Sequence, residues 1–108
     1  MDKNELNIKY IQKYIEEGNI IWTEHCLNRL TQRDILIADV INTINTGKII
    51  EYYYEDYPYQ SCLTLGQDNN NEILHIVCGI NKKTVYIITA YYPDSIKWEE
   101  DMKTRRMK

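Results

Sequence analysis

The sequence lacks an apolar run of transmembrane length, a secretory signal, an internal repeat and a linker-like segment. The missing run excludes a membrane-spanning helix, and the polar N-terminus of mixed charge differs from a signal peptide. Without a repeat or a linker, 108 residues supply one hydrophobic core and hence one domain, residues 1-108. We therefore expect a cytoplasmic globular protein with no membrane partner.

Metal-binding motifs are missing as well. The three cysteines, Cys26, Cys62 and Cys78, are odd in number, lie in apolar patterns and show no C-x-x-C spacing. We expect them to be small buried hydrophobic residues rather than disulfides or metal ligands. The sequence thus predicts no metal site and no cofactor.

A strongly basic surface is also absent, because the formal net charge is −3 and the pI is about 5.3. This balance argues against strong non-specific binding to nucleic acid but leaves room for a small basic patch. Phenylalanine is missing, whereas tyrosine occurs ten times. Such an excess indicates many aromatic rings that keep one polar end in water.

The hydrophobic pattern predicts an α+β fold, in which three N-terminal helices are followed by a four-stranded antiparallel meander sheet. Helical spacing of apolar residues covers about 3–17, 23–33 and 37–46, and strand-like patterns cover 48–55, 60–66, 72–80 and 84–92. Gly18 and Gly47 are expected to end two of the helices in the left-handed conformation. Ile20–Trp22 is predicted as a short extended link, and Trp98 as the anchor of a polar tail or arm.

The second predicted helix carries the most distinctive polar pattern. Thr23 is a suitable N-cap, and His25, Arg29 and Arg33 follow at intervals of four residues. This spacing places the three nitrogen-rich side chains in one row along the edge of the buried stripe. The edge is where a cleft would open, so the row is a candidate site.

This row belongs to a longer series of motifs over residues 20–98. They are Thr23-x-His25-x-x-x-Arg29-x-x-x-Arg33-x-Ile35, Asp39-Val40, Gly47-Lys48-Ile49-Ile50, Leu63-x-Leu65-Gly66, Leu74-His75-Ile76-Val77, Ile88-Thr89-Ala90-Tyr91, Pro93-Asp94 and Trp98. In this order the motifs resemble the small bacterial domain of unknown function 4258, which is similar to the RelE/ParE-like toxin superfamily. The N-terminal helix (1–19) and the polar tail (99–108) lie outside the resemblance. Asp34 stands where that family often has glycine.

The resemblance implies a RelE/ParE-like fold and a toxin of a bacterial type II toxin–antitoxin pair. Toxins of the RelE type cut mRNA without a metal ion, whereas those of the ParE type act on gyrase. The implied partners are a cognate antitoxin, which for some members is a small zinc-finger protein, and RNA or the ribosome. The oligomeric state is not implied.

Metal-independent RNA cleavage needs a base for the 2′-hydroxyl, a cation for the charged phosphorane and an acid for the leaving oxygen. The candidate catalytic residues are His25, Arg29, Arg33, His75 and Tyr91, and the candidate substrate-binding residues are Glu51, Lys48 and Tyr92. Each also has a structural alternative. The histidines can serve a helix cap or the core, and the arginines can pin the helix to the sheet through acidic partners.

One open point decides which side chains share a face with His75. The hairpin that follows its strand can turn at Asn81-Lys82 or at Lys82-Lys83, and a change of one residue reverses the faces. A second open point is the function of the tyrosines in residues 52–59. Such tyrosines most often belong to a strand and turn that pack amphipathically, and the alternatives are base stacking or a partner-binding surface. A partner-binding surface would make the protein a non-enzymatic, protein-binding toxin or interaction module that uses a tyrosine-rich sheet surface. A housekeeping protein without toxicity is a third interpretation.

Overall fold

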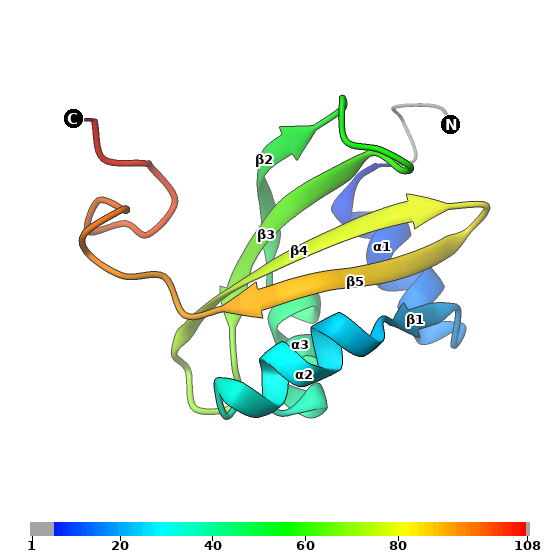
Figure 1. The fold of residues 1–108 in the computed structure, drawn as a ribbon, viewed down its shortest axis with the longest axis horizontal. Helices are drawn as coiled ribbons and strands as arrows, with labels where there is room; N and C mark the ends of the chain where they lie inside the picture. The colour runs from blue at the N-terminus through cyan, green and yellow to red at the C-terminus, as the bar shows by residue number, and fades with distance from the viewer. Residues whose placement is uncertain (1–5, 108) are drawn as a thin grey trace.

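The computed structural model describes residues 6–107, in which three helices and five strands form an α+β domain (Figure 1). In chain order the elements are α1 (Ile8–Glu16), β1 (Ile20–Trp22), α2 (Glu24–Gln32), α3 (Ile37–Asn45), β2 (Lys48–Tyr53), β3 (Ser61–Gln67), β4 (Ile73–Asn81) and β5 (Thr84–Tyr91). The predicted start of the first helix, at about residue 3, lies outside the described residues. Within the described part of the chain, no helix combines the length and apolarity needed to cross a membrane.

The sheet has the strand order β1-β5-β4-β3-β2. Strands β2 to β5 pair antiparallel with their sequence neighbours, which confirms the predicted meander. The prediction of four strands is wrong, however, because β1 adds a fifth and pairs in parallel with β5, with Ile20 opposite Val85. Three extended residues look the same in sequence whether they form a link or a strand. Only their position beside β5 supplies the hydrogen-bonding partner.

Local signals place most helix ends correctly. The Thr23 hydroxyl accepts a hydrogen bond from the Cys26 amide, as expected of an N-cap, and Gly18 follows α1 with a φ of 84°. The prediction for Gly47 is wrong, because its φ is not left-handed. A Cβ at Gly47 would instead lie 2.6 Å from the backbone oxygens of Leu65 and Thr43. This glycine therefore allows the end of α3 to approach β3 closely.

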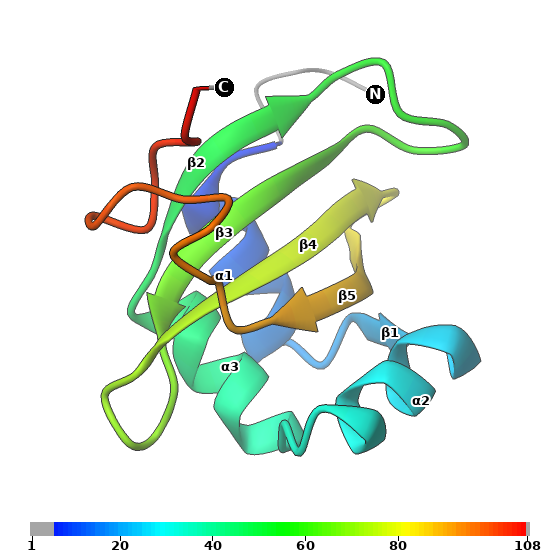
Figure 2. The same ribbon diagram turned by 60° about the vertical axis from the view of Figure 1, so that its left-hand side comes forward.

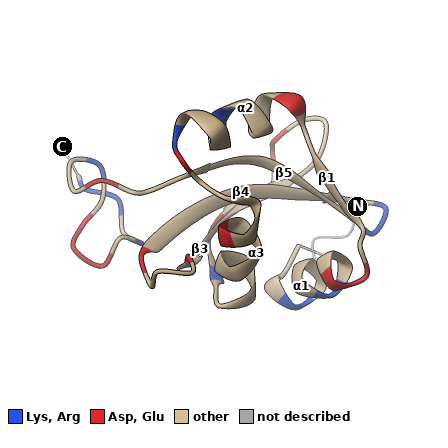
Figure 3. Ribbon diagram, turned by 90° about the horizontal axis from the view of Figure 1, so that it is seen from below, with Lys and Arg blue, Asp and Glu red and all other residues tan. Residues whose placement is uncertain are grey.

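The two sides of the sheet differ in what covers them. Figure 3 shows α1 and α3 on one side, with α2 along the β5 edge on the other. The side facing α1 and α3 packs against these two helices, and the core cluster also takes in Cys26 and Leu30 of α2. All three cysteines are free and buried, as predicted. On the opposite side, the register aligns Lys48, Leu65, His75 and Tyr91 across four strands. We call this opposite side the open face.

The segment after β5 folds back over the open face rather than extending as a free arm. Figure 2 shows the chain crossing in front of the sheet toward β2. Trp98 is 2% exposed and packs edge-on against His75, with ring centroids 4.6 Å apart. The prediction of Trp98 as an anchor is thus confirmed.

Candidate functional site

The β4–β5 hairpin determines what lies beside His75. Lys82 and Lys83 both have positive φ values, 51° and 64°, and Asn81 pairs with Thr84. These are the features of a two-residue type I′ turn, which resolves the alternative left open by the sequence. A bulge then leaves one extra residue in β5, between the pairs Cys78–Ile87 and Val77–Thr89. Without this residue, Ala90 rather than Tyr91 would lie opposite His75.

The His75 imidazole is fully buried and hydrogen-bonded at both nitrogens. Its Nε2 lies 2.6 Å from the Met102 carbonyl oxygen, so this nitrogen carries the proton and donates it. Nδ1 lies 3.3 Å from the Tyr91 hydroxyl oxygen and accepts from that hydroxyl. Burial lowers the pKa of His75 although the hydrogen bond to Met102 opposes this effect, so the neutral imidazole is favoured. His75 therefore reaches a ligand only through Tyr91.

Glu51 fastens the C-terminal segment to β2. Arg105 donates two hydrogen bonds to its carboxylate, at 2.8 and 3.0 Å, and the Tyr53 hydroxyl donates another. The Arg105 guanidinium also lies 4.5 Å from the centre of the Trp98 ring, within cation–π range. Burial raises the pKa of Glu51, but the hydrogen bonds from Arg105 and Tyr53 outweigh it and keep the pKa below its ordinary value. The carboxylate is thus already paired.

A cleft of about 380 Å³ opens where α2, the end of β5 and the C-terminal segment meet. It is lined by three cations, one carboxylate and three aromatic rings, namely Arg33, Lys97, Arg105, Asp94, Tyr91, Tyr92 and Trp98. Burial raises the pKa of Tyr91, so its hydroxyl stays protonated at neutral pH. The cleft is the candidate site, because it combines positive charge with a hydroxyl that is coupled to an imidazole.

Arg33 joins α2 to the edge of the sheet. Its Nη1 donates to the Ala90 carbonyl at 2.6 Å and to the Thr89 hydroxyl at 3.2 Å. Since β1 pairs with β5 only as far as Ile87, this carbonyl lies beyond the end of the β1 ladder. Arg33 thus holds α2 against the sheet, but through a carbonyl and a hydroxyl, and the predicted pairing of Arg33 with an acidic group is wrong. The remaining guanidinium donors border the cleft.

The structure separates the three members of the predicted row. Arg33 lines the cleft, whereas His25 and Arg29 do not. His25 lies about 12 Å from Arg33 along the helix axis. The side chains of His25 and Arg29 are exposed and form no hydrogen bond or ion pair with any described residue. The row is therefore not a single catalytic group around His75.

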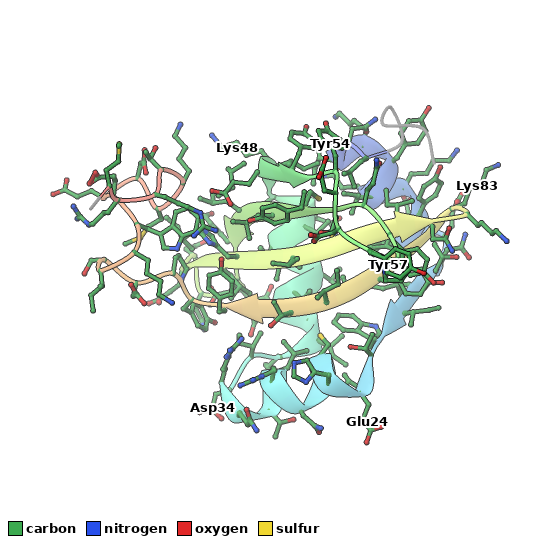
Figure 4. The ribbon with its side chains drawn as sticks, turned by 45° about the horizontal axis from the view of Figure 1, so that its top comes forward. Glu24, Asp34, Lys48, Tyr54, Tyr57 and Lys83 are labelled. Atoms are coloured by element: carbon green, nitrogen blue, oxygen red, sulfur yellow. The ribbon has the colours of Figure 1, made fainter. Side chains whose placement is uncertain are left out.

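Two predicted substrate-binding residues lie in different settings. Lys48 is exposed at the start of β2, at the end of the sheet nearest the C-terminal segment (Figure 4). It shares the cross-strand row of His75 but does not line the cleft. Tyr92 lines the cleft, and its hydroxyl donates to the Asp68 carboxylate at 2.7 Å. This bond lowers the pKa of Asp68 and fixes the Tyr92 ring.

Sequence reasoning missed Asp94 and Lys97 and treated Arg105 mainly as part of a solvated tail. The useful signal was Trp98, because a large anchor in a polar segment brings its neighbours onto the surface that buries it. Within residues 6–107, no three His, Cys, Asp or Glu side chains are grouped as metal ligands would be.

Comparison with known proteins gives one match. A family model described as a domain of unknown function (DUF4258) matches residues 22–92, more than half of the chain. No curated protein and no solved structure matches significantly. The matched region includes Arg33, His75 and Tyr91 but ends before Lys97 and Arg105.

Proposed function

This chain belongs to the DUF4258 family, and from its cleft we propose that it is the toxin of a bacterial type II toxin–antitoxin pair that cleaves mRNA without a metal ion. One observation carries the proposal: three cationic side chains line a cleft beside the Tyr91 hydroxyl, which is hydrogen-bonded to His75. The proposal includes a RelE/ParE-like fold, supported by three helices that precede or flank an antiparallel meander. It also includes a cognate antitoxin as partner.

The cations of the cleft suit a phosphodiester. Arg33 uses one nitrogen on the sheet edge and keeps its other donors for phosphate oxygens. The Lys97 ammonium forms no hydrogen bond with a described residue, so it is available to the ligand. Arg105 is paired with Glu51 and contributes less net charge. Arg33 and Lys97 are accordingly assigned to the phosphate.

The proton transfers follow from the hydrogen bonds around His75. As the ribose 2′-oxygen attacks phosphorus, its proton passes to the Tyr91 oxygen while the Tyr91 proton passes to His75 Nδ1. The resulting imidazolium keeps its Nε2 bond to the Met102 carbonyl. Arg33 stabilises the phosphorane, and Lys97 protonates the departing 5′-oxygen. The products are a 2′,3′-cyclic phosphate and a 5′-hydroxyl.

Cleavage of labelled mRNA in EDTA, with and without ribosomes, tests this function. We expect fragments with 2′,3′-cyclic phosphate ends and growth arrest on induction. Arg33→Gln should lower the cleavage rate by about 100-fold or more, as does loss of an oxyanion-stabilising donor elsewhere. Lys9→Gln on α1 is the charge-matched control. Intact RNA under both conditions, together with normal growth, would refute the proposal.

A second candidate function rests on two tyrosines at the end of the outer strand β2, Tyr52 within the strand and Tyr54 just beyond it. Tyr52 and Tyr54 stack with ring centroids 5.3 Å apart and are 46% and 38% exposed. Exposed tyrosines are enriched in protein interfaces, so this pair supports a non-enzymatic toxin or interaction module. A protein that leaves RNA intact but elutes in a stoichiometric complex, which Tyr52→Ser dissociates, would favour this function.

A further inference from the structure

A second depression opens on the open face, away from the cleft, and has no role in the chemistry above. Its volume is about 310 Å³, and it is lined by the aromatic rings of Tyr57, Tyr59 and Tyr86 together with Pro58, Ile88, Thr23 and Asp56. The Asp56 carboxylate accepts a hydrogen bond from the Ser61 hydroxyl. Tyr59 and Tyr86 stack with ring centroids 4.8 Å apart. Tyr57 is 94% exposed on the loop between β2 and β3, and Figure 4 shows this loop reaching across the sheet. We call this depression the aromatic pocket.

Helix α2 connects the aromatic pocket to the cleft. Its N-cap, Thr23, borders the pocket, and Arg33 just beyond its last turn lines the cleft. The distance between these two positions is about 15 Å along the helix axis. Arg29 lies between them, one turn before Arg33 and on the same side of the helix.

The connecting stretch carries positive charge without an acidic partner in the described structure. The Arg29 side chain is exposed and forms no ion pair or hydrogen bond with a described residue. Arg33 reaches the open face, because it contacts Thr89, which pairs with Val77 in a row of that face. Figure 3 shows the basic residues of α2 on the part of the helix nearest the C-terminal segment. A net charge of −3 for the whole chain therefore coexists with a local cationic path.

We propose that the aromatic pocket and Arg29 form a binding path for a single strand of RNA that continues from the cleft. The inference rests on the proposed function, which places the scissile phosphate beside Arg33. Arg29 binds a neighbouring phosphate, and a base farther along the strand stacks on Tyr57 or Tyr59. Proteins that bind single strands combine these same two features, a cationic groove and aromatic platforms. A span of about 15 Å accommodates about four stacked nucleotides.

Oligodeoxythymidylates test the path, because they cannot be cleaved without a 2′-hydroxyl. Binding of dimers, tetramers and hexamers to the full chain is measured by fluorescence anisotropy over a series of salt concentrations. We expect affinity to rise from dimer to hexamer. Arg29→Gln should weaken hexamer binding severalfold and reduce the salt slope by about 0.7, the value for one lost phosphate contact on a single strand.

Tyr57→Ala should weaken hexamer binding by about fivefold or more, because one stacked base is lost. Neither Tyr57→Ala nor Arg29→Gln should alter dimer binding, and the control Lys9→Gln on α1 should bind all three lengths as the wild type does. Both sites are exposed, so the variants should fold, and circular dichroism checks that they do.

The outcomes separate this inference from the nuclease function. Equal affinity for all lengths, no binding, or hexamer binding unaffected by both substitutions overturns the path even if RNA is cleaved. Length-dependent binding that requires Arg29 and Tyr57 supports the path even if RNA remains intact, in which case the nuclease function alone fails.

Discussion

His75 Nδ1 lies 3.3 Å from the Tyr91 hydroxyl, and the two residues occupy paired positions on adjacent antiparallel strands. The imidazole is buried beneath Trp98, whereas the tyrosine lines the cleft. The pair thus links a group shielded from water to the surface where a ligand would bind.

Tyr91→Phe should abolish RNA cleavage while preserving the fold. The substitution removes only the hydroxyl that exchanges a proton with His75, so we expect a loss of at least about 100-fold in cleavage rate. Stability should fall by about 1 kcal/mol, because His75 Nδ1 loses its hydrogen-bond donor inside the protein. Single-turnover kinetics and urea unfolding measure the two effects. Tyr10→Phe on α1 is the matched control, and an equal cleavage rate in both variants would remove Tyr91 from the mechanism.

The stability of the protein should fall as the pH drops below 6.5, the ordinary pKa of histidine. The folded state lowers the pKa of His75. Below pH 6.5 the imidazole is therefore protonated in the unfolded chain while it remains neutral in the folded protein, and this difference favours unfolding. The contribution of His75 to the free energy of unfolding is therefore fully present above pH 6.5 and decreases as the pH falls toward the pKa of His75 in the folded state. Thermal unfolding between pH 8 and pH 5 measures the slope. His75→Gln should flatten the dependence of stability on pH. An unchanged pH dependence in this variant would contradict the assignment to His75.

Arg105→Gln should loosen the C-terminal segment from the sheet. The substitution removes the bidentate pair with Glu51 and the cation–π contact with Trp98. The Arg105 side chain is 54% exposed, so solvent screening limits the loss to about 1 kcal/mol. Trypsin should then cleave after Lys97 and Lys103 faster, and Trp98 emission should shift to the red.

Arg106→Gln provides the control for this segment. Arg106 pairs with Glu99 and the Ser95 carbonyl, both within the segment, and not with the sheet. Its loss should therefore change proteolysis less than the loss of Arg105. Equal cleavage rates would mean that Trp98 alone holds the segment in place.

Gly66→Ala should destabilise the protein severely. A Cβ at this position would lie 1.9 Å from the Thr43 carbonyl oxygen, so α3 and β3 would have to separate. We expect a loss of about 3 kcal/mol or more, typical of a forced backbone displacement in the core. Gly18→Ala meets no atom within 4 Å but has a φ of 84°, and should cost about 1–2 kcal/mol. Chemical denaturation compares the two, and similar losses would contradict the packing argument.

Some features were predictable because they depend on residues close together in the chain. Thr23 caps α2 through the amide three residues on, and Gly18 ends α1 through its own backbone freedom. The strand segments and their antiparallel order followed from short turns. Asp34 has a φ of 55°, in the left-handed region that glycine adopts most easily. This backbone conformation explains why the related family often has glycine at the position.

Other features depended on contacts between distant segments. The sequence by itself determined the helices, the meander and the DUF4258 membership, since these rest on local periodicity and motif order. Only the tertiary structure decided that Ile20–Trp22 pairs with β5, that a bulge aligns Tyr91 with His75, and that Trp98 brings Lys97 to the cleft. Strand pairing, register and docking of a terminal segment arise from groups far apart in sequence, which no short-range pattern records.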